Sequence, residues 1–128
     1  MLKKIAIVVG IAFVAIGALG FVPALVPDGK LLGLFEVNAM HNLVHLVTGV
    51  IAILVGFNGE GASQTFFRIF GVIYALVAAL GVFYGEQPLL GVIANNRADV
   101  GLHVLIAVIA LYLGFALRPR KPTPPVPG

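Results

Sequence analysis

The residues of this chain best suited to ligand chemistry are three histidines, because the chain contains no other histidine and no cysteine. His41 and His45 are four positions apart, which places both side chains on one face of a helix. The segment HNLVH has the histidine spacing of the HExxH metalloprotease motif but lacks its glutamate, so it does not indicate peptide hydrolysis. Binding through imidazole nitrogen is therefore the chemistry to consider, with Asp99, four positions before His103, as a carboxylate candidate.

Four uses of these side chains follow from their types. His41, His45, Asp99 and His103 together form a ligand set for a borderline divalent metal such as zinc, iron or copper. His45 and His103 alone can act as the two axial ligands of a b-type haem. A proton or quinone-headgroup site is a third use, because histidine titrates near neutral pH and ionisable groups within membrane spans are usually functional. In the fourth, the histidines only hydrogen-bond loop carbonyls or each other and hold helices in register.

The candidate residues occupy equivalent positions in an internal repeat. Residues 31–57 match residues 89–115 without a gap at an offset of 58, and residues 10–20 match residues 71–81 at an offset of 61. Equivalent pairs include Asn38 and Asn96, His45 and His103, and Gly56 and Gly114. The chain is therefore predicted to be a duplicated pair of helices, with parallel copies related by a pseudo-two-fold axis along the membrane normal.

Composition indicates an integral membrane protein of one domain. Of 128 residues, 60% are hydrophobic and 10% are charged, and the mean hydropathy is +1.09, whereas soluble proteins contain about 25% charged residues. Four windows are apolar over the roughly 17–25 residues that a spanning helix needs: 5–22, 39–57, 66–84 and 98–117. The expected fold is all-α, an integral membrane four-helix bundle built from two parallel repeated helical hairpins. It occupies residues 1–118 and is followed by a proline-rich, disordered cytoplasmic tail, 119–128.

The first apolar window has an alternative interpretation as a cleavable signal peptide. Lys3 and Lys4 precede it, and the small-residue segment Ala18-Leu19-Gly20 lies near its end. The repeat favours retention, because removing this window would leave the helix at 66–84 without its equivalent in the first copy.

The distribution of basic residues predicts the orientation. If the four helices alternate in direction, six basic residues lie on one side of the membrane, and Lys30 and Arg97 lie on the other. The six are Lys3, Lys4, Arg68, Arg118, Arg120 and Lys121. By the positive-inside rule both termini are cytoplasmic. The net charge of +3 then reflects orientation and requires no nucleic-acid partner.

Capping residues and small residues are expected to bring the histidines together. Asn38 and Asn96 are predicted N-caps of the second and fourth helices, after apolar interfacial segments, and a short polar loop, 58–65, is expected to join antiparallel helices. Small residues further along each helix favour close packing in lipid; they are Ala52 and Gly56 on the second helix, and Ala107, Ala110 and Gly114 on the fourth. If these stripes face each other, His45 lies near His103, with His41 and Asp99 about one turn, roughly 6 Å, nearer the outer surface.

Several segments resemble the bacterial domain-of-unknown-function 4383 family. They are GLFEVN at 33–38, HNLVH at 41–45, Thr48-Gly49, GVIY at 71–74, and Asn96, Asp99 and Leu102-His103. The resemblance covers nearly the whole chain except the tail. It implies a four-helix membrane protein without an assigned activity, so it supports the fold and adds no reaction. One departure is that Val100 follows Asp99, where the resemblance leads us to expect asparagine.

The sequence favours a small non-enzymatic membrane protein, structural or ligand-binding, in the bacterial inner (cytoplasmic) membrane. The alternative is a metal- or haem-binding redox subunit that uses the histidine cluster near the outer surface. The expected partners are the lipid bilayer and either a membrane-protein complex or further copies of the chain.

Overall fold

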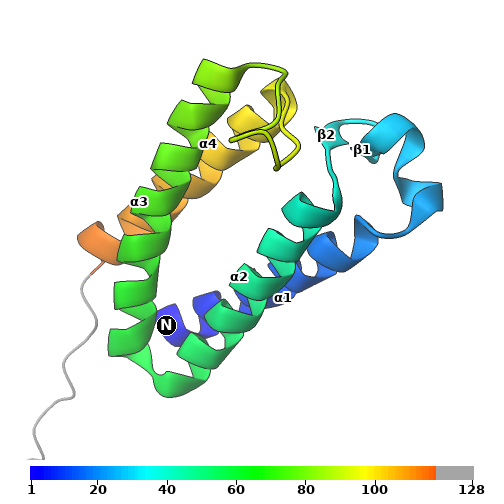
Figure 1. Ribbon diagram of the computed structural model, residues 1–128. Helices are drawn as coiled ribbons and strands as arrows, with labels where there is room; N and C mark the ends of the chain where they lie inside the picture. Colours follow the sequence, from blue (N-terminus) through cyan, green and yellow to red (C-terminus); the bar gives the residue numbers. More distant parts are fainter. Residues whose placement is uncertain (118–128) are drawn as a thin grey trace, which may run out of the picture.

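The computed structural model describes residues 1–117, in which four long helices dominate (Figure 1). In chain order the elements are α1 (Leu2–Leu19), η1 (Pro23–Leu25), η2 (Pro27–Gly29), β1 (Lys30–Leu31), β2 (Phe35–Glu36), α2 (Ala39–Asn58), α3 (Glu60–Tyr84), α4 (Arg97–Leu111) and the π-helical turn η3 (Tyr112–Ala116). α1, α2, α3 and α4 with η3 are each long and apolar enough to cross a membrane. The expectation of a helical protein with four such helices is therefore confirmed.

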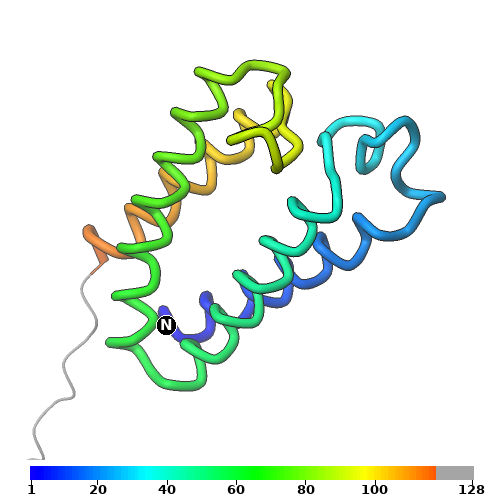
Figure 2. The backbone as a smooth tube through the Cα atoms, in the orientation of Figure 1, coloured from blue at the N-terminus to red at the C-terminus, as the bar shows by residue number. Residues whose placement is uncertain are grey.

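The helices form two hairpins, α1 with α2 and α3 with α4, and the most extensive helix packing lies within each hairpin. The segments that connect the helices of each hairpin lie at the same end of the molecule (Figure 2). We call this end, formed by residues 20–38 and 85–96, the loop end. The opposite end, with the start of α1, the junction of α2 and α3 and the end of η3, is the turn end.

Glycines allow the helices within each hairpin to approach closely. A Cβ atom added to Gly10 of α1 would lie 2.6 Å from the carbonyl oxygen of Gly49 of α2, and one added to Gly49 would lie 2.6 Å from the Gly10 carbonyl. In the second hairpin, a Cβ atom on Gly114 would lie 2.7 Å from the backbone nitrogen of Arg68. Backbone therefore packs directly on backbone, as small residues permit in lipid.

The core between the hairpins consists of aromatic and small side chains. Phe13 of α1 contacts Phe70 and Tyr74 of α3, with ring centroids 5.5 and 5.9 Å apart. Ala107 and Ala110 of α4 are buried in the same cluster. The first hairpin thus contributes to the core through α1, while α3 and α4 supply the other side.

The small residues of α2 and α4 do not face each other, so that expectation is wrong. Gly56 packs on α1, where an added Cβ atom would lie 2.8 Å from the carbonyl oxygen of Lys3, and Gly114 packs on α3. The physical reason is that glycine brings the helices of one hairpin together. The space between the hairpins is filled instead by large rings from α1 and α3.

Each connecting loop contains a tight turn of similar geometry. In the first loop Leu31 pairs with Phe35, and the Leu32-Gly33 turn has positive φ angles of 54° and 72°. The segment 89–93 forms a bridge in the second loop, and Leu90-Gly91 has φ angles of 52° and 75°. A leucine with positive φ is strained, so the surrounding packing must hold both turns in place.

Two element boundaries differ from the expectation. The polar loop expected at 58–65 is a turn at Gly59 (φ 115°), because residues 60–65 form the first turns of α3. The expected loop was placed by the low hydropathy of residues 58–65, and a polar segment can still form a helix. α1 ends at Leu19, before Val22 and Pro23, since the residue that precedes a proline avoids the helical conformation. The expected proline-rich tail, 119–128, lies outside the described residues.

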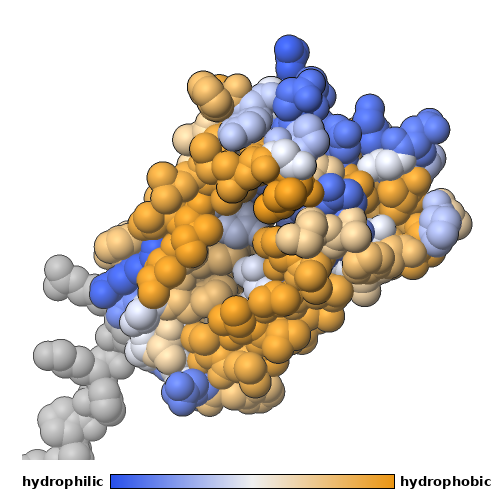
Figure 3. Space-filling model, in the orientation of Figure 1, coloured by the Kyte–Doolittle hydropathy of each residue, from blue (hydrophilic) through white to orange (hydrophobic). Residues whose placement is uncertain are grey.

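The surface has the distribution of a membrane-spanning protein. Hydrophilic side chains gather towards the two ends of the molecule, and apolar side chains cover the middle (Figure 3). A contiguous exposed apolar surface of this kind is typical of contact with a membrane rather than with water.

Candidate metal centre

Asparagine caps fix where the candidate residues emerge from their helices. The Asn38 side chain accepts a hydrogen bond from the backbone N–H of His41 at 2.9 Å, so His41 lies in the first turn of α2. The Asn96 side chain accepts one from the backbone N–H of Asp99 at 3.0 Å and begins α4 in the same way. Both predicted N-caps are confirmed.

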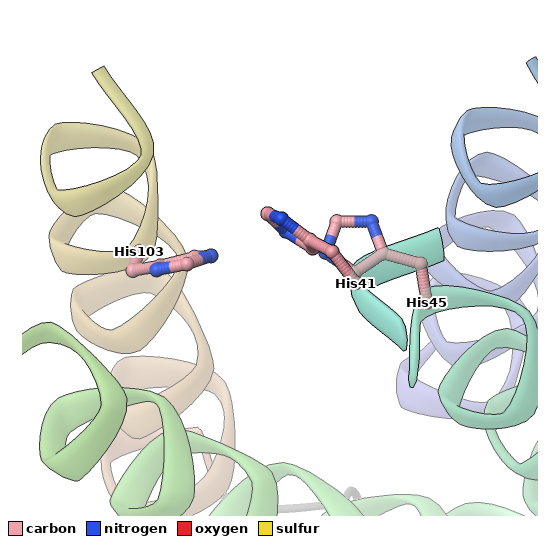
Figure 4. A group of neighbouring side chains, drawn as sticks. All are labelled: His41, His45 and His103. Carbon is pink, nitrogen blue, oxygen red and sulfur yellow. The ribbon is translucent and has the colours of Figure 1, made fainter. Parts of the chain in front are cut away.

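The three histidines meet between the hairpins (Figure 4). Their nearest ligand nitrogens all lie within 4.8 Å of one another. The ring of His41 has its centroid 4.7 Å from that of His45 and 6.1 Å from that of His103. All three side chains are buried, with exposed fractions of 4, 8 and 5%. Because α2 supplies two rings and α4 the third, the cluster joins the two hairpins.

A backbone carbonyl orients the ring of His41. Its Nδ1 atom lies 2.9 Å from the carbonyl oxygen of Glu36 in β2. Since a carbonyl oxygen only accepts, Nδ1 carries the proton of this hydrogen bond, and in the neutral ring Nε2 is the nitrogen left for a ligand. Histidines that bind metals usually donate their other ring nitrogen to such a carbonyl, which fixes the tautomer. The Nδ1–carbonyl contact of His41 is thus of the kind that metal-binding histidines make.

His103 contributes a buried nitrogen that is free to bind. Its Nδ1 atom has no hydrogen-bond partner among the described residues. A buried polar atom left unpaired costs about 1–3 kcal/mol. Coordination to an ion, or a hydrogen bond to a ligand, would remove this cost.

Aromatic rings pack against His45 and His103 in equivalent ways. The ring of Phe13 lies 5.2 Å from that of His45, and the ring of Tyr74 lies 5.5 Å from that of His103. The sequence did not single out Phe13 or Tyr74 as site residues. The internal repeat could have pointed to them. Phe13 and Tyr74 are equivalent in the match between 10–20 and 71–81, just as His45 and His103 are equivalent in the longer match.

Asp99 does not join the histidines. Its Oδ2 atom accepts hydrogen bonds from the backbone N–H of Asn96 at 2.9 Å and from that of Glu36 at 3.1 Å. The carboxylate thus completes the cap of α4 and holds the loop of the other hairpin. Among the described residues, the group of potential ligands is His41, His45 and His103, without a carboxylate.

Two side-chain amides connect the hairpins at the loop end. Nδ2 of Asn38 donates to the carbonyl oxygen of Val92 at 2.9 Å, and Nδ2 of Asn96 donates to that of Leu34 at 2.8 Å. Donors and acceptors are both 58 positions apart, so the two bonds are reciprocal. Together they hold the starts of α2 and α4, and hence the histidines, near one another.

The chain belongs to the family described as domain of unknown function DUF4383, whose sequence profile matches residues 3–116. No curated protein and no solved structure shows significant similarity to the chain. Family membership therefore confirms the resemblance seen in the sequence and assigns no activity.

Proposed function

We propose that this member of the DUF4383 family is a multi-pass membrane protein that binds a divalent metal ion through His41, His45 and His103. Zinc is the leading candidate. The convergence of three imidazoles, with ligand nitrogens within 4.8 Å of one another, carries the proposal. Imidazole nitrogen suits zinc, copper, iron and nickel, and three histidines with one open position form a known zinc arrangement.

The distances fit an ion after a small closure of the side chains. Zinc–nitrogen bonds of about 2.0–2.1 Å place the nitrogens of a tetrahedral site roughly 3.3 Å apart. The three rings therefore need to move together by about an ångström, which side-chain rotation accommodates. Three protein ligands leave the fourth position open, as in zinc sites that exchange ligands rather than in closed structural sites.

A single ion accounts for the arrangement better than a haem does. A haem held by His45 and His103 needs both rings on opposite faces of a flat macrocycle. The ring of His41 contacts both other rings, and so occupies the region that the macrocycle would fill. A purely structural role leaves the unpaired Nδ1 atom of His103 without a purpose.

Metal analysis of the purified protein tests this proposal. We expect one equivalent of zinc per chain, measured by elemental analysis after loading and buffer exchange, and loss of that metal in each of His41→Ala, His45→Ala and His103→Ala. Thr48→Val is the matched control, because Thr48 lies on α2 beside the same cavity but outside the ligand group. Retention of stoichiometric metal by all three alanine variants, or absence of metal from the folded wild type, contradicts the proposal, whereas a Soret band would point to haem.

The reciprocal contacts support descent from two parallel hairpins. The Asn38–Val92 and Asn96–Leu34 bonds exchange equivalent residues. Two aromatic–imidazole pairs also correspond: Phe13 packs on His45 within the first hairpin, and Tyr74 packs on His103 within the second. A rotation that exchanges the hairpins relates each contact to its partner, which favours a pseudo-two-fold axis running through the histidine cluster.

The basic residues support an orientation with both termini in the cytoplasm and the histidines near the outer surface. Because the chain has no cysteine, single cysteines report topology without further changes. In intact cells a membrane-impermeant maleimide should label Asp28→Cys at the loop end and spare Asn58→Cys at the turn end. The opposite pattern reverses the orientation, and labelling of both contradicts the four-span topology.

A further inference from the structure

A cavity of about 640 Å³ adjoins the histidines and runs between α2 and α3. Leu89 and Ile93 line it at the loop end, and Gly61 and Ala62 line it at the turn end. Figure 3 shows a hollow between the two hairpins with apolar side chains along its border. A cavity of this size is within the range of ordinary small-molecule sites.

Polarity is distributed unevenly along this cavity. The three histidines, Thr48 and Tyr74 lie on the loop-end side, whereas Thr65 is the one further polar side chain of the lining and the rest of the wall is aliphatic and aromatic. Ile51 and Val55 supply that wall from α2, and Ile69, Ile73 and Val77 supply it from α3. The shape suits a molecule with one polar end and a long apolar body.

The charge of the proposed metal centre specifies the polar end. Three neutral imidazoles leave the double positive charge of the ion uncompensated, and no carboxylate of the described residues belongs to the group. A buried charge without a counter-charge is costly. The Asp99 carboxylate is bonded to backbone N–H groups of Asn96 and Glu36. The compensating anion is then the fourth ligand, either hydroxide from a bound water or an anionic group of a bound molecule.

We infer, on the basis of the proposed metal centre, that the cavity binds a long-chain carboxylate of the fatty-acid type. Its carboxylate oxygen takes the open coordination position of the metal, and its alkyl chain lies along the aliphatic wall between α2 and α3. From His45 to Val55 this wall is roughly 15 Å long by helical rise. Burial of each methylene of the chain adds to the affinity, so the tail contributes selectivity over small anions.

Cobalt-substituted protein in lipid nanodiscs tests the inference, because the visible bands of Co²⁺ report a change of ligand directly. Dodecanoate should alter these bands saturably. Acetate, with the same headgroup and no tail, should need at least about tenfold higher concentration, and methyl dodecanoate, with the tail but no anionic oxygen, should leave them unchanged.

Two tryptophan variants separate the cavity from the metal. Ile73→Trp places a large ring in the cavity and leaves the histidines intact, whereas Leu76→Trp lies on α3 outside the cavity lining, at a side chain that is 61% exposed. We expect both to keep the cobalt spectrum. Only Ile73→Trp should weaken the response to dodecanoate, by about tenfold or more.

The outcomes distinguish the two proposals. If cobalt binds to the histidines but dodecanoate and acetate act at equal concentration, the cavity does not hold the tail and the inference is wrong, while the metal centre stands. If a decyl-substituted benzoquinone shifts the bands and dodecanoate does not, the ligand has a neutral headgroup and the carboxylate class is wrong. If folded wild-type protein binds no cobalt, the metal centre fails, and the inference fails with it.

Discussion

The backbone N–H of Glu36 donates a hydrogen bond to the carboxylate of Asp99, 3.1 Å away, and this bond crosses from one hairpin to the other. The carbonyl oxygen of the same residue lies 2.9 Å from Nδ1 of His41. A chain of contacts therefore runs from the cap of α4 through one residue of β2 to the ring of His41. Asp99, expected from the sequence to be a metal ligand itself, lies where it positions His41, one of the proposed ligands.

Substitution of Asp99 distinguishes a positioning residue from a ligand. Asp99→Asn keeps an acceptor oxygen for the N–H groups of Glu36 and Asn96, so we expect zinc affinity within about twofold of wild type. Asp99→Ala removes both hydrogen bonds and should weaken zinc binding by about tenfold, as loss of an outer-shell partner does. Isothermal titration with zinc measures both, and a loss of binding in Asp99→Asn equal to that in His103→Ala would make Asp99 a direct ligand.

His41 combines a structural hydrogen bond with a proposed ligand nitrogen, and asparagine separates the two. The Asn side-chain amide reaches the position of Nδ1 and can donate to the Glu36 carbonyl, but it has no atom at the position of Nε2. His41→Asn should therefore lose metal while unfolding at nearly the wild-type concentration of SDS. His41→Ala should lose metal and about 0.5–1.5 kcal/mol of stability as well. Metal retention by His41→Asn would exclude Nε2 as the ligand.

The reciprocal asparagines give a direct measure of the symmetry between the hairpins. Asn38→Ala and Asn96→Ala each remove a helix cap, worth about 0.5–2 kcal/mol, together with one bond between the hairpins. The two variants should be destabilised to a similar extent in SDS unfolding, and Asn58→Ala, at the exposed end of α2, should be close to wild type. A loss confined to one of the two would argue that only one loop holds the hairpins together.

Glycine packing inside the first hairpin predicts opposite effects of one methyl group at two sites. Gly49→Ala places a Cβ atom 2.6 Å from the Gly10 carbonyl and should cost about 1–3 kcal/mol through overpacking. Gly101→Ala, on α4, has no neighbouring atom within 4 Å and should be neutral or stabilising by up to about 1 kcal/mol. Equal effects of the two substitutions would mean that α1 and α2 are not packed as described.

Local signals in the sequence predicted the helices and the caps, and missed which neighbouring helix the small residues of α2 and α4 pack against. Runs of apolar residues marked the four helices, and Asn38 and Asn96 marked two helix starts, because both signals depend on near neighbours. The small-residue stripes were assigned to the wrong interface. A glycine such as Gly56 is compatible with close packing on either neighbouring helix, and the choice depends on where Phe13, Phe70 and Tyr74 fit.

The convergence of the histidines was expected for a reason that the structure does not support. The stripes of α2 and α4 do not pack together, yet His45 and His103 meet because imidazoles bridge a wider space than small residues do. Asp99 lies in the cap of α4 and outside the histidine group, and a carboxylate three residues after an asparagine is a signal for both a cap and a ligand. The carbonyl of Glu36, which orients His41, is a backbone group, so residue types in the sequence could not reveal its role.

The asparagine bonds at the loop end and the short junction at Gly59 join the hairpins at both ends of the molecule. We therefore expect the proposed ligand to enter between α2 and α3, from the hydrocarbon of the bilayer. Its occupancy then follows its mole fraction among the lipids and not its concentration in water. Two ligands of equal intrinsic affinity would differ in occupancy by the ratio of their partition coefficients, so the membrane itself acts as the first stage of selection.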